Sequence, residues 1–194
     1  MRDLTERMTF LRNRLQTAYD GLGQSSGRPY LYFVYPPTDE LALRRLIDQE
    51  LMAIPGLTPL RIDVLLLTID VLRGEEEPRE NLLKHPLDGT QAAADIAGIW
   101  TRALRRRMLK TLAAVTSDMR PVIYLEGLAA LHPLTNPTTV MESFAEHSID
   151  HPQTLRPVPI VLFVPGVQLP HMSRMYQYLD AKSPIVSMYR GEDI

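Results

Sequence analysis

Residues 30–40 read YLYFVYPPTDE, and this stretch decides the fold class. Its first six residues are apolar on both faces, as in a strand buried in the middle of a sheet. Two prolines then end the strand, because proline has no backbone N–H to donate to a neighbouring strand. Thr38 or Asp39 can cap a helix that follows directly. The apolar stripe of that helix consists of Leu43, Ile47, Leu51 and Ile54. A buried strand that leads into a helix is the first unit of an α/β fold.

Further apolar runs continue this alternation toward the C-terminus. The expected strands are residues 60–64, 121–125, 160–164 and 185–189. The expected helices are residues 88–115 and 138–146. Strands that alternate with helices predict a mainly parallel sheet with helices on both faces, in a single α/β domain over residues 1–194.

Three segments are less regular. Residues 65–72 fit either an extension of the second strand or a helix, and periodicity alone does not decide between them. Residues 75–78 read EEEP and predict an exposed acidic loop. Pro165 and Gly166 are expected to close the strand that precedes them.

The N-terminal residues 1–22 predict an amphipathic helix. Leu4, Met8 and Leu11 recur at spacings of four and three residues, and Asp3 can cap the helix with Glu6 three residues later. A flexible connection over residues 23–29 separates this helix from the first strand. Its apolar face can therefore pack on the main fold or serve as a surface for a partner protein.

The composition excludes several classes of site. The chain has no cysteine, so disulfides, thiolate zinc sites and a cysteine nucleophile are absent. Its 21 basic and 23 acidic residues give a formal net charge of −2, which argues mildly against a role in gripping nucleic acid. No apolar run approaches the roughly 18 residues of a membrane span, and the N-terminus lacks the pattern of a signal peptide. We expect a cytoplasmic protein.

The order of elements has a P-loop-like (Rossmannoid) layout that lacks the phosphate-binding loop. Glu126 ends an apolar strand, at the place of a Walker B carboxylate. A phosphate loop needs free backbone N–H groups, glycines, a lysine and a hydroxyl, whereas Pro36 and Pro37 stand here, followed by Asp39. Acidic side chains at a helix N-terminus repel phosphate. We expect no nucleotide cofactor and no catalytic residues.

Two alternatives remain open. The first is a metal-dependent hydrolase or nuclease that uses Asp39, Glu126 and His147. His147 and His151 are four residues apart, but Pro152 disfavours a helix at that point, so surface or loop histidines are the simpler interpretation.

The second alternative is a nucleic-acid-binding module. Four basic side chains lie opposite the apolar arc of the long helix, and Arg107 lies at the edge of that arc. The four residues are Arg102, Arg105, Arg106 and Lys110. They predict a solvated face, or else a docking surface for an acidic partner or a nucleic-acid backbone.

Several segments together resemble the BrxB proteins, small components of bacteriophage exclusion (BREX) defence systems. The matching segments are residues 30–37 (YLYFVYPP), 122–127 (VIYLEG), 131–134 (LHPL) and 159–166 (PIVLFVPG). The resemblance implies a non-enzymatic adaptor that binds a PglZ-like protein of the alkaline phosphatase superfamily, alongside other BREX components such as a DNA methyltransferase and a large ATPase. It carries over no catalytic residue.

Overall fold

The computed structural model describes residues 3–22, 29–85, 89–144, 148–172, 174–188 and 190–194. The helices are α1 (Leu4–Ala18), α2 (Glu40–Leu46), α3 (Val64–Leu72), α4 (Glu76–Lys84), α5 (Gly89–Leu112) and α6 (Pro137–Glu142). The strands are β1 (Tyr30–Tyr35), β2 (Thr58–Asp63), β3 (Pro121–Glu126), β4 (Ile160–Gln168), β5 (Met175–Tyr178), β6 (Ile185–Ser187) and β7 (Glu192–Asp193).

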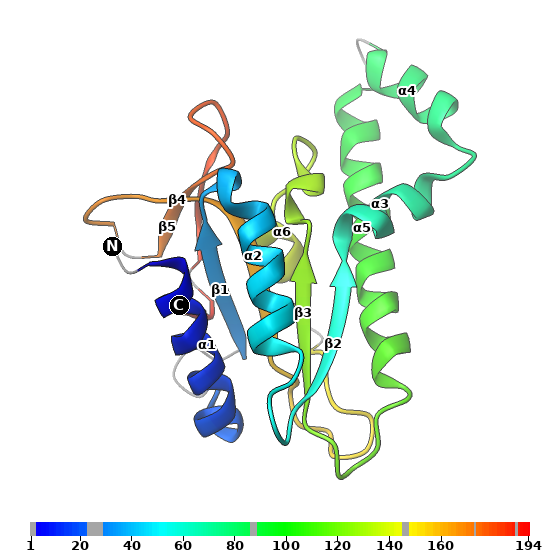
Figure 1. Cartoon of the computed structure of the whole chain (residues 1–194). Helices are drawn as coiled ribbons and strands as arrows, with labels where there is room; N and C mark the ends of the chain where they lie inside the picture. Colours follow the sequence, from blue (N-terminus) through cyan, green and yellow to red (C-terminus); the bar gives the residue numbers. More distant parts are fainter. Residues whose placement is uncertain (1–2, 23–28, 86–88, 145–147, 173, 189) are drawn as a thin grey trace.

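The main sheet has the strand order β2-β3-β4-β1-β7, and these strands run parallel (Figure 1). β1 lies beside β4, with Tyr30 opposite Ile160 and Tyr35 opposite Pro165. β5 and β6 extend the sheet in antiparallel fashion from the end of β4. The predicted fold class, an α/β fold with a mainly parallel sheet, is confirmed.

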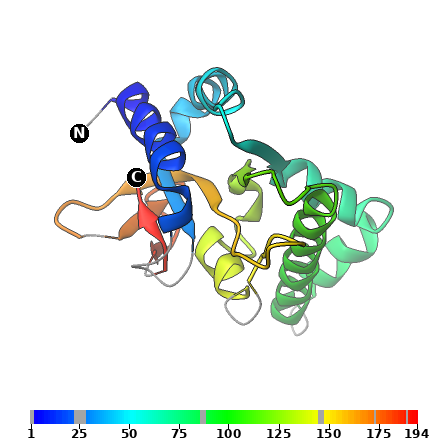
Figure 2. The ribbon, with the colours of Figure 1, turned by 90° about the horizontal axis from the view of Figure 1, so that it is seen from below.

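Helices cover both faces of the sheet, as predicted (Figure 2). Side chains of β1 alternate between the faces because successive residues of a strand point in opposite directions. Leu31, Phe33 and Tyr35 pack with α1 and α2, whereas Tyr32 and Val34 face the core that α3, α5 and α6 close. The central strands therefore contribute to two apolar cores, one on each side.

The long helix α5 packs through the stripe that its sequence predicts. Its buried residues are Ala92, Ile96, Trp100, Leu104, Met108 and Leu112. No described helix combines the length and apolar character that a membrane crossing requires.

The acidic segment 75–78 was predicted as a loop, and this prediction is wrong because the segment begins α4. Pro78 is the third residue of that helix, where a missing N–H removes no helical hydrogen bond. Glu76 and Glu77 lie in its first turn, where negative charge stabilises the helix dipole. Residues 65–72, left open by periodicity, belong to α3, and the Asp63 carboxylate accepts a hydrogen bond from the Leu66 N–H at its start.

The end of β4 also differs from the prediction. The strand does not close at Pro165 but continues to Gln168, because residues 166–168 turn to pair with β5. A Cβ on Gly166 would lie 2.5 Å from the Gln177 carbonyl oxygen, so the close pairing requires glycine. β5 and β7 were not predicted, and the last predicted strand is confirmed as β6 over Ile185–Ser187.

Candidate functional site

The carboxyl ends of β1, β2 and β3 lie at one edge of the sheet, where ligands bind in folds of this kind (Figure 1). Tyr35, Asp63 and Glu126 are the last residues of these strands. α2 and α3 begin at the same edge. The edge therefore places strand-end side chains beside the first turns of two helices.

Ion pairs occupy this edge. The Glu126 side chain is only 2% exposed, and its Oε2 accepts a hydrogen bond of 2.7 Å from Arg61 Nη2. Arg61 also donates to Asp48 at 2.5 Å. Arg44 of α2 pairs with Glu40 at 2.7 Å and with Asp63 at 3.2 Å. Each of these carboxylates is thus held by an arginine of the same chain.

Burial and hydrogen bonds shift the pKa values of this network. Burial raises the pKa of the Glu126 carboxyl, while the hydrogen bond from Arg61 acts in the opposite sense. The pKa of the Tyr35 hydroxyl is raised by burial and by the hydrogen bond that it donates to Glu40. The pKa of Arg44 is raised chiefly by its hydrogen bond to Glu40. The arginines occupy Glu40, Asp63 and Glu126 through ion pairs, although burial still leaves the Glu126 pKa above its ordinary value.

The structure does not bring Asp39 and Glu126 together. β4 lies between β1 and β3, so the ends of these two strands are about 10 Å apart. Asp39 lies in a 3-10 turn over Pro37–Asp39 that stands where a phosphate loop would be. Its side chain accepts from Thr38 at 3.3 Å and does not cap α2, contrary to the prediction. Among the described residues, no three His, Asp or Glu side chains converge as metal ligands would.

His151 lies in a turn, as predicted, but it is buried. Its Nδ1 accepts hydrogen bonds from the Gln153 and Thr154 N–H groups, both at 3.2 Å, and its Nε2 lies 3.1 Å from the Thr116 carbonyl oxygen. Both ring nitrogens therefore hold the turn in place. His147 lies outside the described residues.

A cavity of about 310 Å³ opens at the same edge of the sheet. The residues that line it are Pro37, Glu40, Arg44, Leu65, Gly127, Ala129, Ala130, Pro165 and Leu179. Most of these contribute apolar surface, and the charged pair Glu40–Arg44 is already joined. The cavity therefore offers shape and apolar contact rather than free catalytic groups.

The helix α3 exposes apolar side chains beside this cavity. Leu65 is 45% exposed, Leu66 60% and Ile69 51%, and we call these three residues the α3 patch. Leu41 of α2, which starts at the same edge, is 73% exposed. The other side of α3 packs on the core through Val64 and Leu67. The sequence run 65–72 contains six apolar residues besides Thr68 and Asp70, and the charged Asp70 is the one signal in it for the side that remains uncovered.

The predicted basic face of α5 is largely exposed. Arg102, Arg106 and Lys110 are exposed, whereas Arg105 is half-buried, with its guanidinium 5.9 Å from the centre of the Phe144 ring. Arg106 and Lys110, together with Arg107, line a groove of about 280 Å³ between α3 and α5. The structure thus divides the predicted set: Arg106 and Lys110 belong to the groove, and Arg102 does not line it.

The predicted partner residues of the N-terminal helix are placed differently. Met8 and Leu11 are fully buried among the side chains of α2 and the sheet, and Leu4 is half-buried. In the folded chain Met8 and Leu11 are therefore contacts of its own core and not of a partner. Most of the predicted flexible connection, residues 23–28, lies outside the described residues.

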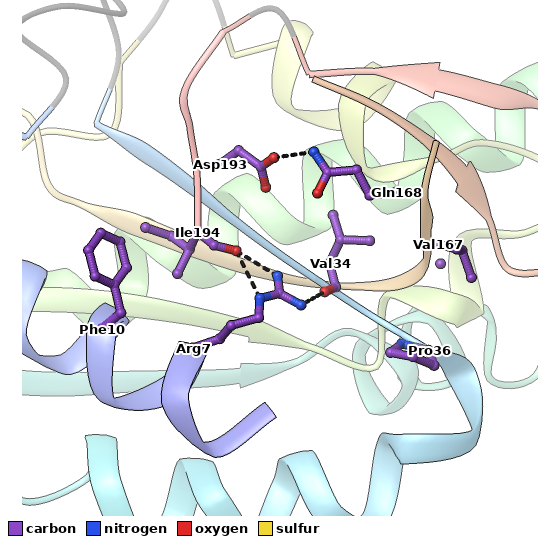
Figure 3. Close-up of a pocket in the computed structure, with 9 residues that line it drawn as sticks. Arg7, Phe10, Val34, Pro36, Val167, Gln168, Asp193 and Ile194 are labelled. Carbon is purple, nitrogen blue, oxygen red and sulfur yellow. Dashed lines mark hydrogen bonds between the residues drawn. The ribbon is translucent and has the colours of Figure 1, made fainter. Parts of the chain in front are cut away.

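Arg7 fastens α1 to the sheet (Figure 3). Its guanidinium donates to the Ile194 oxygen at 2.6 Å and to the Val34 oxygen at 2.6 Å, and it lies 4.5 Å from the centre of the Phe33 ring. It also lines a cavity of about 230 Å³ with Asp193, whose carboxylate accepts from Gln168. These hydrogen bonds of Arg7 join α1 to Val34 of β1 and to Ile194.

Comparisons with family models, with curated proteins and with solved structures returned no match to this chain. The fold itself defines the class, an α/β protein whose mainly parallel sheet ends in mutually paired charges and an apolar edge.

Proposed function

We propose that this chain is a non-catalytic adaptor that docks onto a partner protein through the α3 patch. The observation that carries the proposal is the exposure of Leu65, Leu66 and Ile69 next to a sheet edge where the charged groups already pair with one another. An enzyme needs groups at this edge that are free to contact a substrate. Here the exposed surface is apolar, and the carboxylates of Glu40, Asp63 and Glu126 are held by arginines.

Exposed apolar side chains in one cluster are typical of interaction surfaces. Burying one leucine or isoleucine side chain gains about 1.5–3 kcal/mol relative to leaving it in water. The α3 patch is displayed on a helix whose opposite side is anchored through Leu67. A rigid helix that presents apolar side chains loses little conformational entropy on binding.

The resemblance of residues 30–37, 122–127, 131–134 and 159–166 to BrxB proteins supports one partner in particular. We propose that the partner is a PglZ-like protein of a BREX-type anti-phage complex in the cytoplasm. Arg44 and Arg61 already occupy the carboxylates of Glu40, Asp63 and Glu126 at the described sheet edge, and this arrangement is consistent with an adaptor role. An adaptor needs a rigid surface, and a sheet covered on both faces supplies one.

The test is co-purification of the affinity-tagged chain with the PglZ-like protein of its host. We expect the wild type to retain the partner. The double variant L66S/I69S should retain at least about tenfold less of the partner, because clustered apolar anchors dominate interface energies. The matched control is L82S/L83S on α4, where both leucines are also exposed.

Both double variants should unfold within about 1 kcal/mol of the wild type, since they change exposed positions. A wild type that fails to retain the PglZ-like protein contradicts the proposed partner. Retention by L66S/I69S that equals the control contradicts the α3 patch as the docking surface.

A further inference from the structure

We infer that the groove between α3 and α5 binds an acidic, amphipathic segment of the partner protein. This inference rests on the proposed adaptor function and specifies the chemistry of the partner. The groove, called here the α3–α5 groove, is lined by Leu67, Asp70, Val71, Ala103, Arg106, Arg107 and Lys110.

The floor of the groove is apolar. Leu67 is buried, and Val71 and Ala103 are partly buried against the same core. Leu67 and Val71 are four residues apart on α3, so their side chains lie one above the other along one face. This floor accepts an apolar side chain from the segment that enters.

One wall of the groove carries uncompensated positive charge. Arg106, Arg107 and Lys110 are exposed, and none of them forms an ion pair within the part of the chain that the structure describes. The arginines at the sheet edge differ, because Arg44 and Arg61 each contact two carboxylates. Three unpaired cations along one helix attract carboxylates of a partner and raise the association rate.

The opposite wall favours a protein over a nucleic acid. Asp70 lies on α3 with its carboxylate 2.8 Å from Arg73, so a segment that enters the groove must place its own negative charges toward α5 and away from α3. A phosphate backbone also gains nothing from an apolar floor. An acidic protein segment uses both features, with carboxylates toward α5 and an apolar residue on Leu67 and Val71.

The groove is continuous with the α3 patch. Leu66 of the patch lies four residues before the groove residue Asp70, so the two side chains are neighbours on one face of α3. A partner seated on the patch therefore reaches the groove without crossing any other element. The patch supplies apolar contact, and the groove adds the charge that selects an acidic partner.

A direct test measures fluorescence anisotropy of a labelled helical peptide built from leucine, alanine and glutamate, with leucines at spacings of three and four. A second peptide has lysine in place of each glutamate, and a labelled DNA duplex is the third probe. The proteins are the wild type, R106E/K110E, and the control R102E, whose exposed arginine lies on the same helix outside the groove.

We expect the glutamate peptide to bind the wild type, and R106E/K110E to weaken its binding by at least about tenfold, since attraction is replaced by repulsion. R102E should change the affinity by less than about threefold, as a charge outside the contact does. Added salt should weaken binding of the glutamate peptide.

Equal binding of the lysine peptide, or equal binding by R106E/K110E, overturns the inference. Tighter binding of the DNA duplex that R106E/K110E abolishes would assign the groove to a phosphate backbone instead. Self-association of the wild type that R106E/K110E abolishes in sedimentation velocity would assign it to a second copy of this chain.

Co-purification separates this inference from the proposed function. If the PglZ-like protein is retained equally by the wild type and R106E/K110E, the groove inference fails and the adaptor proposal stands. If the wild type retains no PglZ-like protein while the glutamate peptide binds in the groove, the proposed partner fails and the groove inference stands.

Discussion

Glu126 is the last residue of β3, and its side chain is almost fully buried. It ends an apolar strand at the position of a Walker B carboxylate, yet it is buried and paired with Arg61. Removing a carboxylate from water is costly unless a cation and hydrogen bonds compensate. Arg61 supplies part of this compensation from the neighbouring strand β2, where Asp63 lies opposite Glu126. The pair therefore orders the edge of the sheet on which the adaptor proposal depends.

Stability should depend on pH through this carboxyl. Burial raises the Glu126 pKa above its ordinary value of 4.5, so the folded chain still holds a proton at pH values where the unfolded chain has released it. The free energy of unfolding therefore falls as the pH rises through the window between 4.5 and the raised pKa. Glu126→Gln removes this dependence. We expect the stability of the wild type relative to E126Q to decrease as the pH rises through that window.

The measurement is urea unfolding of both proteins across that pH range. Glu77→Gln serves as the control because Glu77 is exposed on α4. A wild-type advantage over E126Q that grows with pH would show that the hydrogen bond from Arg61 outweighs burial.

At the scale of elements, α1 buries its apolar stripe, whereas α3 leaves one apolar side exposed. α1 has a regular apolar stripe that suits a partner, but Arg7 fastens it to the sheet and the stripe is buried. α3 has no regular stripe, and one of its sides stays exposed. The difference arises because α1 lies flat on a face of the sheet, whereas α3 lies at its edge, where only one side meets the core.

Leu11→Ala should destabilise the chain by about 2–5 kcal/mol, because it removes a fully buried side chain and leaves a cavity. Gln16→Ala, on the exposed side of the same helix, should change the free energy of unfolding by less than about 0.5 kcal/mol. Urea unfolding without any partner measures both. If L11A were as stable as Q16A, α1 would not be docked on the sheet in solution.

At the scale of the whole molecule, the sheet joins two cores into one unit. β1, β3 and β4 each place side chains in both cores, so a loss of packing on one face disturbs the strands that support the other. Trp100, the only tryptophan, packs in the core on the α5 side, opposite α1. Its fluorescence therefore reports on the face that α1 does not touch.

Unfolding should be a single cooperative transition over the predicted single domain. We expect L11A to lower the midpoint of the Trp100 fluorescence transition by the same amount as the midpoint seen by far-ultraviolet circular dichroism. A fluorescence midpoint that stays at its wild-type value while the dichroism midpoint falls would show that the two faces unfold separately.

The elements that have a local pattern could be predicted from the amino-acid sequence. The central strands β1 and β3 and the buried stripe of α5 are visible in it because continuous apolar runs and a 3.6-residue period mark which residues must leave water. The alternation of strands and helices was enough to predict the parallel α/β fold. The lack of a phosphate loop also followed from local residue types.

The features that depend on distant neighbours become visible only in the folded chain. β7 exists because β1 offers its edge, and β4 continues past Pro165 because β5 pairs with it. The pairing of Glu126 with Arg61, the exposure of the α3 patch and the α3–α5 groove all depend on which elements lie side by side. Hydrogen-bond partners and uncovered surfaces are set by contacts between residues far apart in the chain, and a local pattern carries no information about them.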